Sequence, residues 1–223
     1  RNAMERKALT QEYLILTTND KGKLPMANST ETKAGLVAAG IMDLLLEGSI
    51  KIEGKKVEAV GPLPGSLGHL EGLYAYLSDK SRSVTKVIED YCMSFSSSRI
   101  NQLLTDTGNS LSAAGAVAEG KGGLFGNRDL FVPEKAYKEA LIETLKRAAV
   151  QVESLSLHDA ALASLLKETR NLKPYFSKHE NDLMKEKLKA IKNQQDSKII
   201  REMVGYIDAI MTVMMAAVIA TVN

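Results

Sequence analysis

The sequence predicts a mainly α protein, a single helical domain with two short β-hairpins. Of its 223 residues 44% are apolar but only 5% are aromatic, and tryptophan is absent, so the core must be built from the aliphatic residues and methionine that helices tolerate well. Apolar residues recur with helical spacing over most of the chain, and two glycine-centred segments show strand-like alternation instead. The length is sufficient for one substantial core.

Residues 1–3 are typical of an expression-tag remnant, because they precede Met4 and no apolar segment of a targeting signal follows them. The predicted domain therefore covers residues 4–223. A single cysteine, Cys92, excludes an intrachain disulfide and favours a reducing compartment. A cytoplasmic location is expected on this ground.

Two helices are expected at the start of the domain. The first has Thr10 as its N-cap and ends before the Asn-Asp-Lys-Gly run at 19–22. The second spans 34–47 with Thr30 as its cap, and its apolar residues cover nearly every side of a helical wheel. This second helix is expected to be central and buried.

The first hairpin is predicted at 50–60, where apolar and charged residues alternate on both sides of Gly54. Helices are then expected over 67–77, 83–93 and 99–114. The last of them should end with Gly115 in the left-handed conformation that favours glycine.

A second hairpin is predicted from strands at 116–118 and 130–132. The glycines at 120–123 suggest a phosphate-binding loop, but the lysine among them is not followed by Ser or Thr, and no parallel βαβ unit surrounds it. The segment is therefore interpreted as the hairpin tip. Pro133 is expected to open the next helix at its favoured first position.

The rest of the chain has a helical pattern. One apolar stripe consists of Tyr137, Leu141, Leu145, Ala148 and Val152, and a second runs through 157–172. Ser177 and Glu180 have the spacing of a capping box, and Asp196 is a candidate cap for the last helix.

The apolar segment 203–222 approaches membrane-spanning length. It contains Asp208, which is costly inside a bilayer, and no aromatic belt flanks it. A buried C-terminal helix with core-filling methionines at 203, 211, 214 and 215 is therefore favoured over a tail anchor.

No catalytic constellation, metal site or cofactor is predicted. The histidines at 69, 158 and 179 lie in separate segments without a metal-ligand spacing. His158 and Asp159 are expected to be polar residues at a helix start, since adjacent helical residues point about 100° apart. Cys92 is interpreted as a small buried thiol, and an unrecognised enzyme remains as an alternative.

Several segments follow one another in a recognisable order. They are Leu-Thr at 9–10, Asp-Lys-Gly at 20–22, Gly-Leu at 35–36, Leu-Leu-Leu-Glu-Gly-Ser-Ile at 44–50 and then a hairpin. The chain thereby resembles the Golgi phosphoprotein 3 family. The likeness continues through the helix ending at Gly115 and the hairpin around Leu124 and Phe125, so it spans nearly the whole sequence.

This resemblance implies a helical protein without enzymatic activity that binds phosphatidylinositol 4-phosphate at the cytosolic face of membranes. It also places Leu124 and Phe125 at an apolar hairpin tip, which enters the membrane surface and mediates contacts between copies of the chain in a homo-oligomer. Two such side chains are too few for stable anchoring by themselves.

The family's headgroup pocket uses a Trp, an Arg and two further basic residues. The corresponding positions of this sequence are Asn28, Val37, Asn101 and Leu104. None of the four has the residue type that the resemblance implies. Candidate replacement donors for an anionic phospholipid headgroup are Lys33, Arg99 and Arg128.

The favoured function is therefore a peripheral membrane adaptor that binds anionic lipid. The alternative is a nucleic-acid-binding protein, because a helix ending in glycine and followed by a hairpin is also typical of winged-helix modules. The segment 99–114, which would be the recognition helix, carries one Arg, one Asp and no Lys. It offers little charge to neutralise phosphates, so no nucleic-acid partner is expected.

Overall fold

The computed structural model describes residues 4–122, 128–193 and 198–222. The α-helices are α1 (Leu9–Thr17), α2 (Ser29–Leu46), α3 (Glu71–Asp79), α4 (Val84–Cys92), α5 (Ser98–Ala113), α6 (Lys135–Val150), α7 (Leu157–Glu168), α8 (Lys178–Lys192) and α9 (Lys198–Val222), and a 3₁₀ helix, η1 (Gly65–Leu70), precedes α3. The strands are β1 (Ile50–Glu53), β2 (Lys56–Ala59), β3 (Arg82–Ser83), β4 (Val117–Gly122) and β5 (Arg128–Pro133). The predicted mainly α fold class is confirmed.

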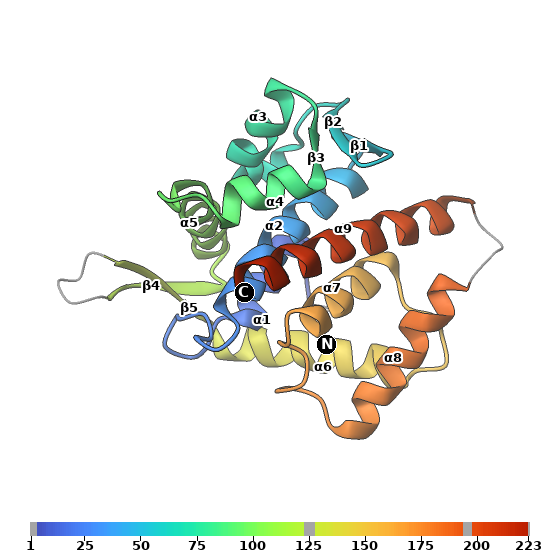
Figure 1. The fold of residues 1–223 in the computed structure, drawn as a ribbon. Helices are drawn as coiled ribbons and strands as arrows, with labels where there is room; N and C mark the ends of the chain where they lie inside the picture. Colours follow the sequence, from blue (N-terminus) through green and yellow to red (C-terminus); the bar gives the residue numbers. More distant parts are fainter. Residues whose placement is uncertain (1–3, 123–127, 194–197, 223) are drawn as a thin grey trace.

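Helix α2 forms the centre of the molecule, as its apolar pattern predicts. It contacts α1, α4, α7 and α9, which surround it (Figure 1). Gly35 allows α1 to pack closely on α2, because a Cβ atom at this glycine would lie 2.1 Å from the Tyr13 hydroxyl oxygen. That hydroxyl donates a hydrogen bond to the carbonyl oxygen of Thr32 at 2.8 Å. The prediction of a buried central helix is therefore confirmed.

The starts of α1 and α2 differ from the prediction. Helix α2 begins at Ser29 with Asn28 as its N-cap, so Thr30 lies inside the helix. Helix α1 begins at Leu9, and Thr10 is likewise an interior residue. The reason lies in α2: the carboxylate of Asp43 accepts hydrogen bonds from the backbone amides of Leu9 at 2.8 Å and Thr10 at 2.9 Å. A side chain from a different helix thus caps α1, which a local sequence pattern does not reveal.

The first predicted hairpin exists but belongs to a larger sheet. Strands β1 and β2 pair in antiparallel fashion, with Ile52 opposite Val57. Strand β3 adds to the other edge of β2, where Arg82 faces Val57. Because β3 has only two residues, it shows no alternation that sequence analysis could detect.

The second hairpin, β4 and β5, has the predicted pairing, with Ala118 opposite Val132. The helix ending before it also ends as expected, since Gly115 has a φ of +72°. The prediction that Pro133 opens α6 was wrong. Pro133 is the last residue of β5, paired with Val117, and α6 begins at Lys135 with Glu134 as its N-cap.

The C-terminal half follows the predicted order of helices. The capping box at the start of α8 is confirmed, since Ser177 and Glu180 exchange side-chain and backbone hydrogen bonds. Val152 was wrongly assigned to the α6 stripe: it lies beyond the helix and is 98% exposed. The candidate cap Asp196 lies outside the described residues.

In α9 the prediction of core-filling methionines is confirmed for Met211 and Met214, which are buried, and Met215 is half-buried. The side chain of Met203 lies outside what the structure describes. Within the described ranges, no helix combines the length and apolar composition needed to cross a membrane.

Candidate functional site

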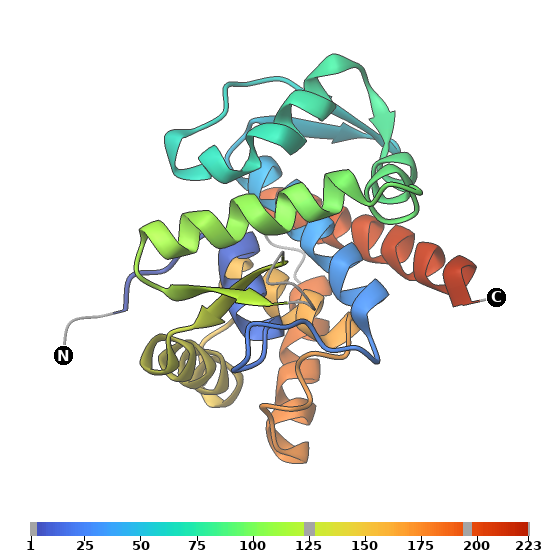
Figure 2. The same ribbon diagram turned by 90° about the vertical axis from the view of Figure 1, so that its left-hand side faces the viewer.

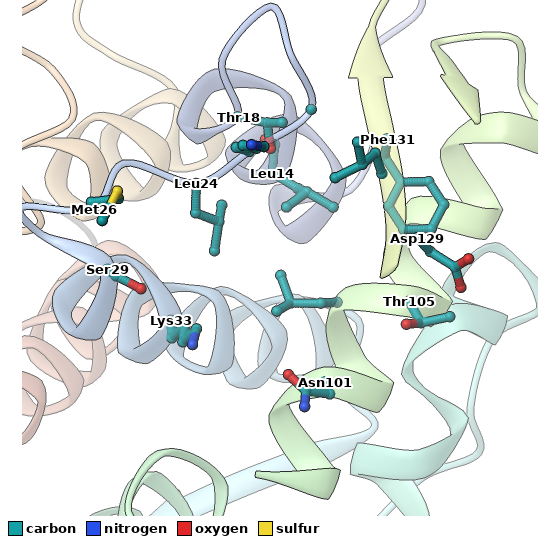
Figure 3. Close-up of a pocket in the computed structure, with 14 residues that line it drawn as sticks. Leu14, Thr18, Leu24, Met26, Ser29, Lys33, Asn101, Thr105, Asp129 and Phe131 are labelled. Carbon is teal, nitrogen blue, oxygen red and sulfur yellow. The ribbon is translucent and has the colours of Figure 1, made fainter. Parts of the chain in front are cut away.

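A pocket of about 890 Å³ opens where α1, α2, α5 and β5 meet (Figure 3). We call it the α2–α5 pocket. The described residues that line it are Leu14, Thr18, Gly22, Lys23, Leu24, Met26, Ser29, Lys33, Asn101, Leu104, Thr105, Asp129, Leu130 and Phe131. The β4–β5 hairpin projects from the same face of the molecule (Figures 1 and 2). Strand β5 therefore serves both as a wall of the pocket and as one arm of the hairpin.

The turn after α1 closes one side of the pocket against β5. The side chain of Asn19 accepts hydrogen bonds from the backbone amides of Lys21 at 2.9 Å and Lys23 at 3.0 Å, which holds the turn together. Gly22 has a φ of +74°, and a Cβ atom there would lie 3.1 Å from the Cβ of Leu130. Only glycine suits this backbone and this approach. The Asn-Asp-Lys-Gly run thus ends α1, as predicted, and also shapes the pocket.

A second close approach fixes the aromatic wall. Gly108, in the middle of α5, lies against the ring of Phe131, and a Cβ atom at this glycine would lie 2.3 Å from a ring carbon. An isolated glycine inside a helical pattern often marks such packing, so Gly108 was the available sequence signal for this contact. The partner across the contact could not be identified from the sequence.

Three of the sequence-predicted site residues lie together in the α2–α5 pocket. Lys33 comes from the second turn of α2, and Asn101 and Leu104 come from the first two turns of α5. Figure 3 shows Lys33 and Asn101 on one side of the cavity, with Leu14, Leu24 and Phe131 on the other.

Three other predicted site residues, Asn28, Val37 and Arg99, are not among the residues that line the pocket. Asn28 is buried beside it but donates its side-chain amide to the carbonyl oxygen of Thr169 at 2.7 Å. Val37 is wholly buried in the core. Arg99 is exposed and lies over the ring of Tyr76, 5.1 Å from its centroid.

The other three predicted positions concern the hairpin. Arg128 begins β5, but its side chain lies outside what the structure describes. Leu124 and Phe125 lie outside the described residues altogether.

The charges at the α2–α5 pocket are mostly positive and unpaired. Lys23 and Lys33 both line the pocket, and neither has an ion-pair partner among the described residues. Asp129 is the carboxylate in the lining, and it pairs with Lys121 across the hairpin. The ammonium of the half-buried residue Lys33 is therefore available to an anionic group.

A family model described as Golgi phosphoprotein 3 (GPP34) matches residues 9–207. The chain belongs to the Golgi phosphoprotein 3 family. The resemblance inferred from the sequence is thereby confirmed, and the match covers the elements from α1 into α9, including all of those that line the pocket. A comparison with curated proteins found no match.

This Golgi phosphoprotein 3 family member also contains a group of charged and titratable residues around the buried Glu12, namely Arg6, Glu12, His158 and Asp159, which we call the ion cluster. The Glu12 side chain is 0% exposed and lies 2.8 Å from Arg6 Nη2 and 2.7 Å from His158 Nε2. Arg6 Nη2 also lies 2.7 Å from Asp159 Oδ1. Burial alone would raise the pKa of Glu12, but the hydrogen bonds and charges of His158 and Arg6 outweigh it and lower that pKa.

The ion cluster extends the prediction for His158 and Asp159. Both stand in the first turn of α7, as expected. Although they are adjacent, each bonds to a different partner, and these partners lie about 150 residues away in the sequence, at and before the start of α1. The cluster fastens the N-terminal segment to α7, and its groups satisfy one another, so it shows no vacancy for a ligand.

A third polar group lies between α1, α2 and η1. The Thr10 hydroxyl donates to Asp43 at 2.8 Å and lies 2.7 Å from His69 Nε2. Burial raises the pKa of Asp43 to about 6 and lowers that of His69 to about 4. In a nucleophilic triad the imidazole stands between hydroxyl and carboxylate, whereas here the hydroxyl stands between the other two. This order leaves the histidine without a carboxylate to orient it, so the arrangement is structural.

Other routes to catalysis find no support in the described part of the chain. Burial raises the pKa of Cys92 to about 12, so its thiolate, the nucleophilic form, is scarce at neutral pH. No group of three or more His, Cys, Asp and Glu residues within the described ranges is placed to hold a metal ion.

Proposed function

We propose that this chain is a peripheral membrane protein that binds an anionic phospholipid at the α2–α5 pocket and acts as an adaptor without catalysis. Membership of the Golgi phosphoprotein 3 family supports the adaptor role. The proposal places the protein at the cytosolic face of a membrane, with phosphatidylinositol 4-phosphate as the lipid that the family resemblance implies.

The observation that carries the proposal is the position of Lys33. It lies in a pocket of about 890 Å³ next to Ser29 and Asn101, and within the described residues no carboxylate neutralises it. An ammonium in a pocket that also contains hydroxyl and amide groups is a suitable site for a phosphate. Lys23 adds a second positive charge at the same pocket.

The location of the pocket also supports membrane binding. Its wall β5 leads directly into the projecting hairpin, whose tip residues the sequence resemblance assigns to the membrane surface. The connection between α1 and α2 and the connection between α4 and α5 lie on the same face (Figure 2). Met26 in the first connection is 95% exposed, and Phe95 in the second is fully exposed. Apolar side chains and lysines on one face together suit an anionic membrane surface.

The winged-helix alternative gains nothing from the structure. Helix α5, which would be the recognition helix, packs against η1, α1 and α4. Arg99 is its basic residue, and it lies over the ring of Tyr76 at one end of the helix. DNA binding draws on several phosphate contacts from Lys and Arg, which α5 does not offer.

The test is flotation of the purified chain with vesicles of phosphatidylcholine, alone or with phosphatidylinositol 4-phosphate or phosphatidylserine. Binding to the anionic vesicles at low salt, and its loss at high salt, is the expected result. Lys33→Gln should weaken that binding about fivefold, because a basic residue near an anionic surface contributes on the order of 1 kcal/mol.

Lys185→Gln is the matched control, since this exposed lysine on α8 removes the same charge away from the pocket. Its binding should equal that of the parent chain. Equal binding of the parent chain to neutral and anionic vesicles, or no binding to either, contradicts the proposal.

A further inference from the structure

The α2–α5 pocket has a larger apolar part than the recognition of a phosphate requires. The apolar side chains in its lining are Leu14, Leu24, Met26, Leu104, Leu130 and Phe131. In Figure 3 the side chain of Leu24 extends into the cavity, and Leu14 and Phe131 stand along its wall. A headgroup in this space would leave these surfaces facing polar atoms or water, which is unfavourable.

The apolar walls are fixed by packing. Phe131 is held against Gly108, where no side chain intervenes, and Leu130 is held against Gly22 in the turn after α1. Leu14 belongs to α1 and is buried in the core. The packing of the protein itself therefore forms the cavity, and the cavity volume lies within the usual range of small-molecule sites, roughly 300–1,000 Å³.

Some of the polar groups of the pocket gather on one side. Lys33, Ser29 and Asn101 stand along α2 and the start of α5 (Figure 3). On the opposite side, the hydroxyl of Thr18 donates to the carbonyl oxygen of Leu14 at 2.6 Å and is thus already engaged. An ammonium that faces apolar side chains across the cavity matches an amphiphile with an anionic group.

We propose that the α2–α5 pocket takes up a single-chain anionic amphiphile, such as a fatty acid or a lysophospholipid. Its acidic group lies at Lys33, and its hydrocarbon chain lies along Leu14, Leu24 and Phe131, with Leu104 completing the wall. This inference rests on the proposed function, because it concerns the same site, and it names the part of the lipid that enters the protein.

The charge complementarity of Lys33 selects an acid over a neutral amphiphile. The neighbouring carboxylate of Asp129 does not oppose this selection, because Lys121 pairs with it. Lys23 adds to the positive potential at the pocket. A neutral monoglyceride of the same chain length would retain the apolar contacts but lose the ion pair.

The test is a chain-length series measured by isothermal titration calorimetry, with saturated fatty acids and lysophosphatidic acids at concentrations below micelle formation. Each added methylene that enters the pocket should tighten binding about fourfold. Glycerol 3-phosphate, which has the acidic group and no chain, should not bind measurably. The monoglyceride should bind at least fivefold more weakly than the fatty acid of equal length.

Two variants separate the chain from the charge. Leu104→Gln introduces an amide into the apolar wall at similar size, and it should reduce affinity for the longest acid at least tenfold and flatten the chain-length series. Lys33→Gln should remove the preference for the acid over the monoglyceride while leaving the chain-length dependence. Circular dichroism verifies that both variants are folded, and Lys185→Gln should behave as the parent chain.

The outcomes distinguish this inference from the proposed function. Binding to anionic vesicles with no dependence on chain length, and with competition by glycerol 3-phosphate, overturns the inference and leaves the proposed function standing. Chain-length-dependent binding of free amphiphiles without vesicle binding supports the inference and overturns the membrane role. Absence of both kinds of binding overturns both.

Discussion

Around Glu12, a buried carboxylate has an arginine and a histidine within 2.8 Å, whereas Lys33 lines an open pocket and has no ion-pair partner among the described residues. Both regions place charge beside apolar core. In the ion cluster the neighbouring groups compensate the cost of burying Glu12, so removal of one group should lower the free energy of unfolding. Lys33 at the pocket has no such partner among the described residues, so a change there should mainly alter the affinity for a ligand.

The largest effect on stability is expected for Glu12→Gln. The substitution leaves Arg6 and His158 without the buried carboxylate that they share. Because Arg6 keeps Asp159 and its side chain is 32% exposed, we expect a loss near the lower end of the usual range, about 3 kcal/mol. Urea unfolding followed by circular dichroism measures the change.

The matched control is Glu53→Gln on the surface of β1, where the carboxylate pairs with Lys51 in solvent and a change within about 0.5 kcal/mol is expected. If Glu12→Gln costs no more than Glu53→Gln, the ion cluster does not fasten the N-terminal segment, and the contrast with the pocket fails.

The second effect is the pH dependence of stability that arises from the third polar group, in which Asp43 and His69 flank Thr10. The pKa of Asp43 is raised by burial from 3.8 to about 6, so the folded state holds its proton longer and stability from this group falls as pH rises from about 4 to 6. The pKa of His69 is lowered by burial from 6.5 to about 4, so the unfolded state takes up the proton first and stability rises over nearly the same window. Each contribution is at most about 3 kcal/mol, and the two oppose each other.

Two single variants should therefore change the slope of the free energy of unfolding against pH in opposite directions. Relative to the parent chain, Asp43→Asn removes the falling contribution, so its free energy of unfolding should rise more steeply between pH 4.5 and 6.5. His69→Gln removes the rising contribution, so its free energy of unfolding should fall with pH over that window. Urea unfolding at several pH values tests both, and slopes of the same sign would contradict the assignment.

The smallest effect on stability is expected at the wall of the α2–α5 pocket. Gly108→Ala places a methyl group against the ring of Phe131, which must shift toward the cavity, and overpacking of this kind costs about 1–3 kcal/mol. The variant should also bind long-chain amphiphiles more weakly, because the pocket is narrower. Thermal melting and calorimetry measure the two effects.

Gly72→Ala provides the control for helix propensity. It lies in α3 with no atom near the position of a new Cβ, so alanine there should raise stability by up to about 1 kcal/mol. A stabilising Gly108→Ala with unchanged ligand binding would show that Phe131 does not depend on the glycine for its place in the wall.

The sequence predicted those features that depend on neighbouring residues. The apolar pattern of α2 identified a central helix, and the positions of Gly54 and Gly115 identified a hairpin and a helix end. The predictions were wrong where a residue far away in the sequence determines the local structure. Asp43 caps α1 in place of Thr10, and Pro133 belongs to β5 because it pairs with Val117. Local propensity is weak against such tertiary contacts.

The structure brings only some of the predicted site residues together, and their role in binding stays a prediction. The family pattern pointed to Asn101 and Leu104, and Lys33 was a candidate donor near those positions; all three line one pocket in the structure. The walls were not predictable, since Leu14 and Phe131 look like ordinary core residues until the fold brings α1 and β5 together. Arg99 was a candidate donor because it is close to Asn101 in the sequence, but its guanidinium lies over the ring of Tyr76 and does not line the pocket.

The cap that Asp43 supplies to α1 also has a consequence for the order of folding. Helix α1 has nine residues, and isolated helices shorter than about 12–15 residues are marginal in water. Its first amides bond to a carboxylate 33 and 34 residues further along the chain. We therefore expect α1 to form only when α2 is already in place, and the amide protons of Leu9 and Thr10 to exchange with solvent only when the whole core opens.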